Sequence, residues 1–330
     1  MDKRHLFSRA LLFVAMVLLL GVAQARANVF SDFNEKEQQL YQNAIHFMDN
    51  GMVDTGIDLL KGLDKAHPSN RAVVYEIVYG YIVKQDYEEA YQWAKKLLKL
   101  KDADADSYFI AGNAFDYVGK RKEAIEIYEK GLKKFPNSAR LWVEKGNKAY
   151  MMKNYDESVG CYEHAIDVDP NYDASYYRLA NLYAMSTDPV WAVMYAQNYQ
   201  LHASKYERLM EMGKLIYDLY RENVTRKDGK WEVTFTKKVN LSAYASLDCD
   251  LPYNGFFYYT HKVVLDEGGF AGDTLTLADV ARLHRKYVEI ADTTAHDYYN
   301  VPVLDMERAA LHEGYLDGYI MWMLRGADAG

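Results

Sequence analysis

Small and apolar positions recur along residues 37–206 every 34 residues, a pattern that predicts a series of antiparallel helical hairpins. When the units start at residues 37, 71, 105, 139 and 173, nearly every eighth and twentieth position is Ala, Gly or Ser. Small side chains on the facing sides of two helices let their backbones approach closely. These positions are Ala44, Val78, Gly112, Gly146 and Ala180, followed by Gly56, Ala90, Ala124, Ser158 and Ala192.

Larger residues and prolines follow the same period. Tyr128 and Tyr162 occupy the twenty-fourth position of their units, where they fill the space left beside the small residues. Pro136 and Pro170 come just after the second helix of each hairpin, which they cannot continue. One hairpin cannot bury its own apolar face, so we expect several to stack into a continuous core.

These positions resemble the consensus of the tetratricopeptide repeat family. The two central units match it best, through Tyr108, Gly112, Phe115, Ala124, Tyr128, Gly131 and Pro136, and through Trp142, Gly146, Tyr162, Ala165 and Pro170. The resemblance implies a mainly α protein, an α-α superhelix of about five hairpins over residues 28–206. The last unit departs from the consensus at Pro189 and Ser204, so we expect its second helix to be irregular.

The rest of the chain predicts a capping helix over 207–225 and a small α+β domain over 226–330. Trp231, Val233 and Phe235 alternate with polar residues, which indicates a strand, and residues 255–265 are rich in aromatic and β-branched side chains, which predicts a second one. A capping box at Thr276 and Asp279 begins a predicted helix. A last helix is expected over 304–324, giving a ββαα order, with Ala310, Gly314 and Gly318 forming a flat strip for helix contact.

In the tetratricopeptide family the first helices line a concave groove, and the resemblance places several residues of this chain in it. An asparagine recurs there every 34 residues, and its amide suits the backbone of an extended peptide. We call this set the asparagine ladder: Asn113, Asn147 and Asn181. The other groove candidates are Tyr75, Tyr79, Phe109, Asp116, Tyr117, Tyr150 and Tyr177.

Other interpretations of these residues stay open. The asparagines could bridge neighbouring helices, the tyrosines could be half-buried packing, and the groove could pack against the rest of the chain. Tyrosine suits sugar as well as peptide recognition, so a glycan is an alternative ligand. A clamp for chaperone-tail carboxylates needs Lys and Arg in these positions, where the chain has Glu76, Glu144 and Asp116 instead.

Composition removes other functional classes. The net charge of −8 argues against a nucleic-acid partner, and two cysteines cannot build a disulfide framework. His284, His296 and His312 lack the His-x3-His spacing of a helical metal site, so we expect no metal and no cofactor. We expect a non-enzymatic scaffold that binds a partner protein or peptide, with a hydrolase site in 226–330 as an alternative.

The N-terminus predicts export. Lys3 and Arg4 precede an apolar run over residues 11–22 and small residues at Ala23, Ala25 and Ala27, the pattern of a secretory signal peptide over 1–27. We expect cleavage near Ala25 or Ala27 and a periplasmic or secreted protein that does not span a membrane. Cys161 and Cys249 would then meet an oxidising compartment, and the sequence leaves open whether they are bonded.

Overall fold

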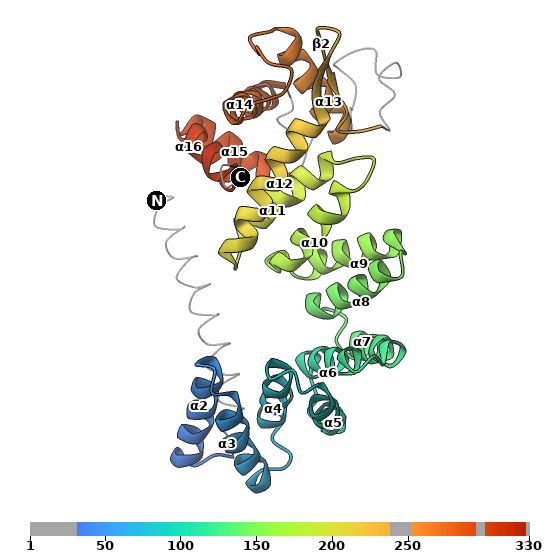
Figure 1. The fold of residues 1–330 in the computed structure, drawn as a ribbon, viewed down its shortest axis with the longest axis vertical. Coiled ribbons are helices and arrows are strands. Elements are labelled where there is room, and N and C mark those ends of the chain that lie inside the picture. The colour runs from blue at the N-terminus through green and yellow to red at the C-terminus, as the bar shows by residue number, and fades with distance from the viewer. Residues whose placement is uncertain (1–31, 238–251, 295–300, 328–330) are drawn as a thin grey trace, which may run out of the picture. The chain divides into compact units, whose positions relative to one another are not determined.

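The computed structural model describes residues 32–237, 252–294 and 301–327. The predicted signal peptide, Cys249 and His296 lie outside these ranges. Fifteen helices and one two-stranded sheet are present in the described residues, so the fold is mainly α as predicted (Figure 1). The chain divides into two compact units, residues 1–145 and 146–330, and each is described by itself.

The first unit is built from consecutive helical hairpins. Its helices are α2 (Glu35–Asp49), α3 (Val53–Ala66), α4 (Arg71–Val83), α5 (Tyr87–Leu97), α6 (Ala105–Tyr117) and α7 (Arg121–Lys134), followed by the first half of α8 (Ala139–Met151). Asn34, Asn70 and Asp104 cap the starts of α2, α4 and α6, where their side chains accept a backbone N–H of the first turn.

Close helix contacts in this unit depend on the small residues of the repeat. A Cβ on Gly56 would lie 2.4 Å from Met48 Cγ, and one on Gly131 would lie 2.8 Å from Tyr108 Cβ. Ala44, Ala90 and Ala124 are fully buried among larger apolar side chains. The observed core therefore follows the predicted 34-residue period.

The second unit continues with α9 (Tyr155–Val168), α10 (Asp173–Ala184), α11 (Val190–His202) and α12 (Tyr206–Asn223), and α12 coincides with the predicted capping helix. The strands β1 (Val224–Lys227) and β2 (Lys230–Val233) then pair as an antiparallel hairpin. Four helices complete the unit: α13 (Tyr253–Asp266), α14 (Leu277–Thr294), α15 (Pro302–His312) and α16 (Leu316–Met323).

The prediction of a strand over 255–265 is wrong, because these residues form helix α13. Their buried positions follow a helical period rather than alternating: Phe256, Phe257, Thr260, His261, Val264 and Leu265. Aromatic and β-branched composition favours a strand, but burial of one helical face overrides that preference. The strand predicted near Trp231 exists, and it pairs with the segment before it.

The prediction of a single helix over 304–324 is also wrong, because two helices cover these residues. Gly314 adopts a φ of +81° and ends α15, and the chain starts again as α16. Gly318 is exposed, and a Cβ added to it would meet no atom within 4 Å, so the predicted flat strip does not exist. The capping box at Thr276 is confirmed: its Oγ1 accepts the N–H of Asp279, and Asp279 Oδ2 accepts the N–H of Thr276.

Within the described residues, the segment after 226 shares its apolar core with the last repeat. One apolar cluster runs from Tyr176 in α10 through Tyr220 in α12 to Leu324, and it includes the inner faces of α13, α14, α15 and α16. The last repeat, the capping helix and the C-terminal segment therefore fold around a shared interior. No helix in the described parts of the chain is both long and apolar enough to span a bilayer.

Candidate peptide-binding surface

In each central repeat the asparagine of the ladder accepts a hydrogen bond from a tyrosine of the same repeat. In the unit that starts at Ala105, the Tyr128 ring occupies the space beside Gly112, where a Cβ would lie 2.1 Å from its Cε1 atom. The Tyr128 hydroxyl donates to Asn113 Oδ1 at 2.6 Å. Burial, together with the charge of Glu144, raises the pKa of this phenol, so it stays a neutral donor.

The next repeat has the same arrangement 34 residues later. Tyr162 lies against Gly146, where a Cβ would be 2.5 Å from its Cε1 atom, and its hydroxyl donates to Asn147 Oδ1 at 2.9 Å. Ser158 adds a bond to the carbonyl of Gly146 at 3.0 Å. Asn113 and Asn147 are half-buried and bridge the two helices of a hairpin.

Asn181, in the last repeat, has a different environment. Alanines replace both the glycine and the tyrosine, at Ala180 and Ala196, so no ring reaches the asparagine from α11. Asn181 is exposed, and its Nδ2 donates to the carbonyl of Tyr177 on its own helix at 2.8 Å. The three ladder residues therefore divide into two that fasten a tyrosine and one on the surface.

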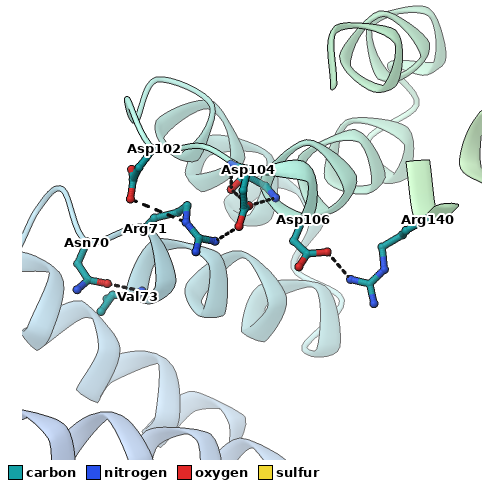
Figure 2. Close-up of polar contacts among 8 residues, drawn as sticks. Asn70, Arg71, Val73, Asp102, Asp104, Asp106 and Arg140 are labelled. Atoms are coloured by element: carbon teal, nitrogen blue, oxygen red, sulfur yellow. Dashed lines mark hydrogen bonds and ion pairs between the residues drawn. The ribbon is translucent and has the colours of Figure 1, made fainter. Parts of the chain in front are cut away.

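In the first unit two of the predicted site residues, Phe109 and Tyr75, lie near charged side chains. Arg140 donates to Asp106 Oδ1 at 2.8 Å, and its guanidinium lies 4.7 Å from the centre of the Phe109 ring. Figure 2 shows this pair beside a second one, in which Arg71 contacts Asp104 at 2.6 Å. Burial, followed by the charge of Asp106, raises the pKa of half-buried Tyr75 to about 12.

The other predicted residues of this unit range from exposed to half-buried. Tyr79 and Tyr117 are exposed, and the Tyr117 ring stacks on Tyr87 with centroids 4.8 Å apart. Asp116 is half-buried, 3.9 Å from Arg121.

Glu76 is a titratable group in the same unit. Its desolvation, together with the charge of Asp49, raises the pKa of its carboxyl to about 7, although a hydrogen bond with Tyr41 lowers it. Glu76 is half-buried, so its charge changes near neutral pH in a partly water-excluded position.

In the second unit three predicted residues meet at one pocket, which we call the α8–α10 pocket. It has a volume of about 230 Å³ and is lined by Tyr150, Tyr177 and Asn181 together with Tyr162, Arg178, Leu182 and Met185. The Tyr177 hydroxyl donates to Glu211 Oε2 at 2.9 Å, and Arg208 lies 4.5 Å from the centre of its ring. All of the lining residues belong to α8, α9 and α10 or directly follow them.

Sequence reasoning missed Arg178 and Met185 in this pocket. Met185 occupies the thirteenth position of its unit, one that the family uses for its groove, so the repeat register could have indicated it. Arg178 gave no such signal, because the sixth position carries no preference that we used. Both side chains are exposed.

Comparison with known families settles the nature of the repeats. Profiles of the tetratricopeptide repeat match residues 105–137, 139–172 and 161–204. Residues 105–204 are tetratricopeptide repeats. An array of this kind is a scaffold fold for protein–protein interaction. No curated protein sequence matches the chain.

Several solved structures are similar in fold to about half of the chain. They include a tetratricopeptide protein of Thermus thermophilus, TTC0263 (15% identity, 55% of this chain and 98% of that one, TM-score 0.48). PilW, a type IV pilus biogenesis factor, has 15% identity over 56% and 86% of the two chains, with a TM-score of 0.47. YrrB, described as having an unusual peptide-binding site, has 14% identity over 55% and 94%, with a TM-score of 0.38.

The histidines considered for catalysis lie at two kinds of position. His312 is exposed and lies 2.9 Å from Asp292. His284 is completely buried and pairs with Glu307, which is 1% exposed, through a 2.7 Å contact between Nε2 and Oε1. The close histidine and glutamate pair is therefore inside the core rather than in an open cleft.

The buried pair belongs to a longer chain of hydrogen bonds. His261 Nδ1 lies 2.7 Å from the carbonyl of Phe257 and must donate to it, so its Nε2 accepts the Tyr220 hydroxyl at 3.0 Å. The Tyr220 oxygen in turn accepts His284 Nδ1 at 2.9 Å. Gln197 of α11 donates to Glu307 Oε1 at 2.7 Å, which links the last repeat to α12, α13, α14 and α15. This chain of bonds is a structural connection between the array and the C-terminal segment.

Proposed function

We propose that the chain is an exported, non-enzymatic scaffold whose tetratricopeptide array binds an extended segment of a partner protein. The observation that carries the proposal is the convergence of Tyr150, Tyr177 and Asn181, from two consecutive repeats, on one open pocket. The C-terminal helices contribute none of its lining, so they do not fill it.

The α8–α10 pocket supplies groups that fit a peptide. Tyrosine rings offer apolar contact area with polar tips, exposed Met185 provides an adaptable apolar surface, and the Asn181 side chain presents an amide. Its carbonyl oxygen can accept a backbone N–H while its Nδ2 stays bonded to Tyr177. These groups recognise a backbone and one or two apolar side chains of a partner.

A peptide selection tests this proposal. Peptides selected from a random displayed library on the purified chain should bind with at least tenfold lower affinity to Tyr150→Ala and to Asn181→Ala. Glu222→Gln, an exposed change on α12 outside the pocket, is the matched control and should bind normally. If no peptide is enriched, or the pocket variants bind as well as the control, the proposal is wrong.

Export is the second part of the proposal and is supported by the signal-like pattern of residues 1–27. The N-terminal residue of the protein recovered from its native host tests it. A start near residue 26 or 28 agrees with export, and an intact N-terminus in the cytoplasmic fraction contradicts it.

A further inference from the structure

The repeat period places an arginine against an aromatic ring at two points of the chain. The guanidinium of Arg140 lies 4.7 Å from the centre of the Phe109 ring, and that of Arg208 lies 4.5 Å from the centre of the Tyr177 ring. Each ring belongs to the fifth position of a unit, and each arginine to the second position of the next, because α12 continues the period. The two arginines therefore have the same place in the repeat.

The two arginines differ in their carboxylate partners. Arg140 donates to Asp106 Oδ1 at 2.8 Å, and Asp106 is the second residue of the preceding unit (Figure 2). The residue at that position before Arg208 is Ala174, which has no side-chain acceptor. Among the described residues, none accepts a hydrogen bond from the Arg208 side chain or forms an ion pair with it. Arg208 therefore keeps available the guanidinium donors that Arg140 uses.

The carboxylates near Arg208 are engaged by other groups. Glu211 Oε2 accepts the Tyr177 hydroxyl at 2.9 Å. Asp173 Oδ2 accepts the backbone N–H of Ser204 at 2.9 Å and its hydroxyl at 2.5 Å. The protein thus holds Arg208 against a ring and leaves its N–H groups for an acceptor from outside the chain.

A second arginine extends this surface into the α8–α10 pocket. Arg178 lines the pocket beside Tyr177, is exposed, and forms no side-chain hydrogen bond or ion pair within the part of the chain that the structure describes. Burial, followed by the bond to Glu211, raises the pKa of Tyr177, and the charges of Arg208 and Arg178 both oppose that rise. Both guanidinium groups therefore lie close enough to the Tyr177 hydroxyl to act on it. We call Tyr177, Arg178 and Arg208 the arginine edge of the pocket.

We propose that the partner segment bound in the α8–α10 pocket carries an Asp or Glu side chain, and that the arginine edge binds its carboxylate. This inference rests on the proposed function and names the chemistry of the partner. A guanidinium presents parallel N–H donors that match a carboxylate, and stacking on a ring limits the side-chain freedom that binding must remove. Apolar neighbours of the acidic residue would contact Tyr150 and Met185 in the same pocket.

Binding of selected peptides to the purified full chain tests the inference. Peptides from a random displayed library, synthesised with amidated C-termini, should share an Asp or Glu near an apolar residue. Changing that residue to Asn or Gln should weaken binding about tenfold. Selected peptides that lack an acidic residue, or that tolerate the change, overturn this inference and leave the proposed function intact. Peptides that bind only with a free C-terminus assign the carboxylate to a chain end and also overturn it, and enrichment of no peptide overturns both proposals.

Two variants locate the carboxylate site. Ala174→Asp gives Arg208 the partner that Asp106 gives Arg140, so it should weaken binding of the acidic peptide about tenfold without lowering the unfolding temperature. Arg208→Gln should weaken the acidic peptide similarly but leave binding of its amide version unchanged. Arg140→Gln, at the same repeat position in the other unit, is the matched control and should bind normally. The inference is wrong if both variants bind the acidic peptide as well as the control does, or if they weaken the acidic and amide peptides equally.

Discussion

The central repeats and the last repeat use the same 34-residue period to make different structures. In the central repeats a glycine admits a tyrosine ring and an asparagine fastens its hydroxyl, so each hairpin is packed by its own residues. In the last repeat Ala180 replaces the glycine and Ala196 replaces the tyrosine, so no equivalent ring packs between the two helices. Helix α11 is buried against the C-terminal helices instead. A repeat at the end of the array therefore takes part of its packing from outside the repeat and leaves its asparagine exposed.

The largest expected effect comes from breaking the connection between the last repeat and the C-terminal segment. Glu307→Ala removes the acceptor shared by Gln197 and His284, both buried, and should lower the free energy of unfolding by about 3–5 kcal/mol. Chemical denaturation measures it. Glu313→Ala, an exposed change at the end of α15, is the control. Equal effects of the two substitutions would show that the buried bonds do not hold this region together.

Acid should weaken the same region. Burial lowers the pKa of His261 to about 3, with a smaller contribution from His284, whereas an unfolded histidine has a pKa near 6.5. The unfolded state therefore binds more protons between these values, and stability falls as the pH drops below about 6.5. The loss should reach about 2–3 kcal/mol at pH 4.5. His261→Gln stays neutral, so its stability should depend less steeply on pH over this range; an unchanged slope would assign the acid sensitivity to other groups.

The glycines of the central repeats should be intolerant of even one methyl group. Gly112→Ala and Gly146→Ala place a Cβ against a tyrosine ring and should each cost about 1–3 kcal/mol. Gly160→Ala on α9 is the matched control, because a Cβ there meets no atom within 4 Å and alanine favours the helix by about 1 kcal/mol. Thermal or chemical unfolding of the three variants should give opposite signs, and a stabilising Gly112→Ala would refute the packing described for Tyr128.

Much of the array could be predicted from the sequence, because the same packing positions recur in each successive unit. The small positions and the tyrosines beside them lie where the period places them. Pro189 marked the irregular last unit, and it is the N-cap of α11. Agreement among several units is what made the prediction strong.

The structure of the C-terminal segment was harder to predict, because its sequence pattern is not repeated and its local secondary-structure propensity is misleading. Residues 255–265 have strand-like composition but are a helix, since their buried face is shared with α12 and α14. Gln197 and Asn198 are polar residues that the sequence alone would place on the surface, yet both are buried. Gln197 bonds to the distant Glu307, and Asn198 lies beside a pocket. Sequence alone gives no distance between segments that are about 110 residues apart.

The site prediction divides in the same way. The predicted site residues lie on the first helices of their units, but the register could not distinguish an asparagine that holds a tyrosine from one that is exposed. That difference is set by the residue fifteen positions later, which is Tyr128 or Tyr162 in the central repeats and Ala196 in the last one. The fifteen-residue spacing between the asparagine and the tyrosine is visible in the sequence, and the structure shows that it corresponds to a hydrogen bond.

The stability of two matched variants, Asn147→Ala and Asn181→Ala, tests this division most directly. Asn147→Ala removes the acceptor of the buried Tyr162 hydroxyl and should lower the free energy of unfolding by about 1–3 kcal/mol, most of which should disappear when Tyr162→Phe is already present. Asn181→Ala should change it by less than about 0.5 kcal/mol. An Asn181→Ala variant as unstable as Asn147→Ala, or an Asn147→Ala variant as stable as the unmodified chain, would contradict the account.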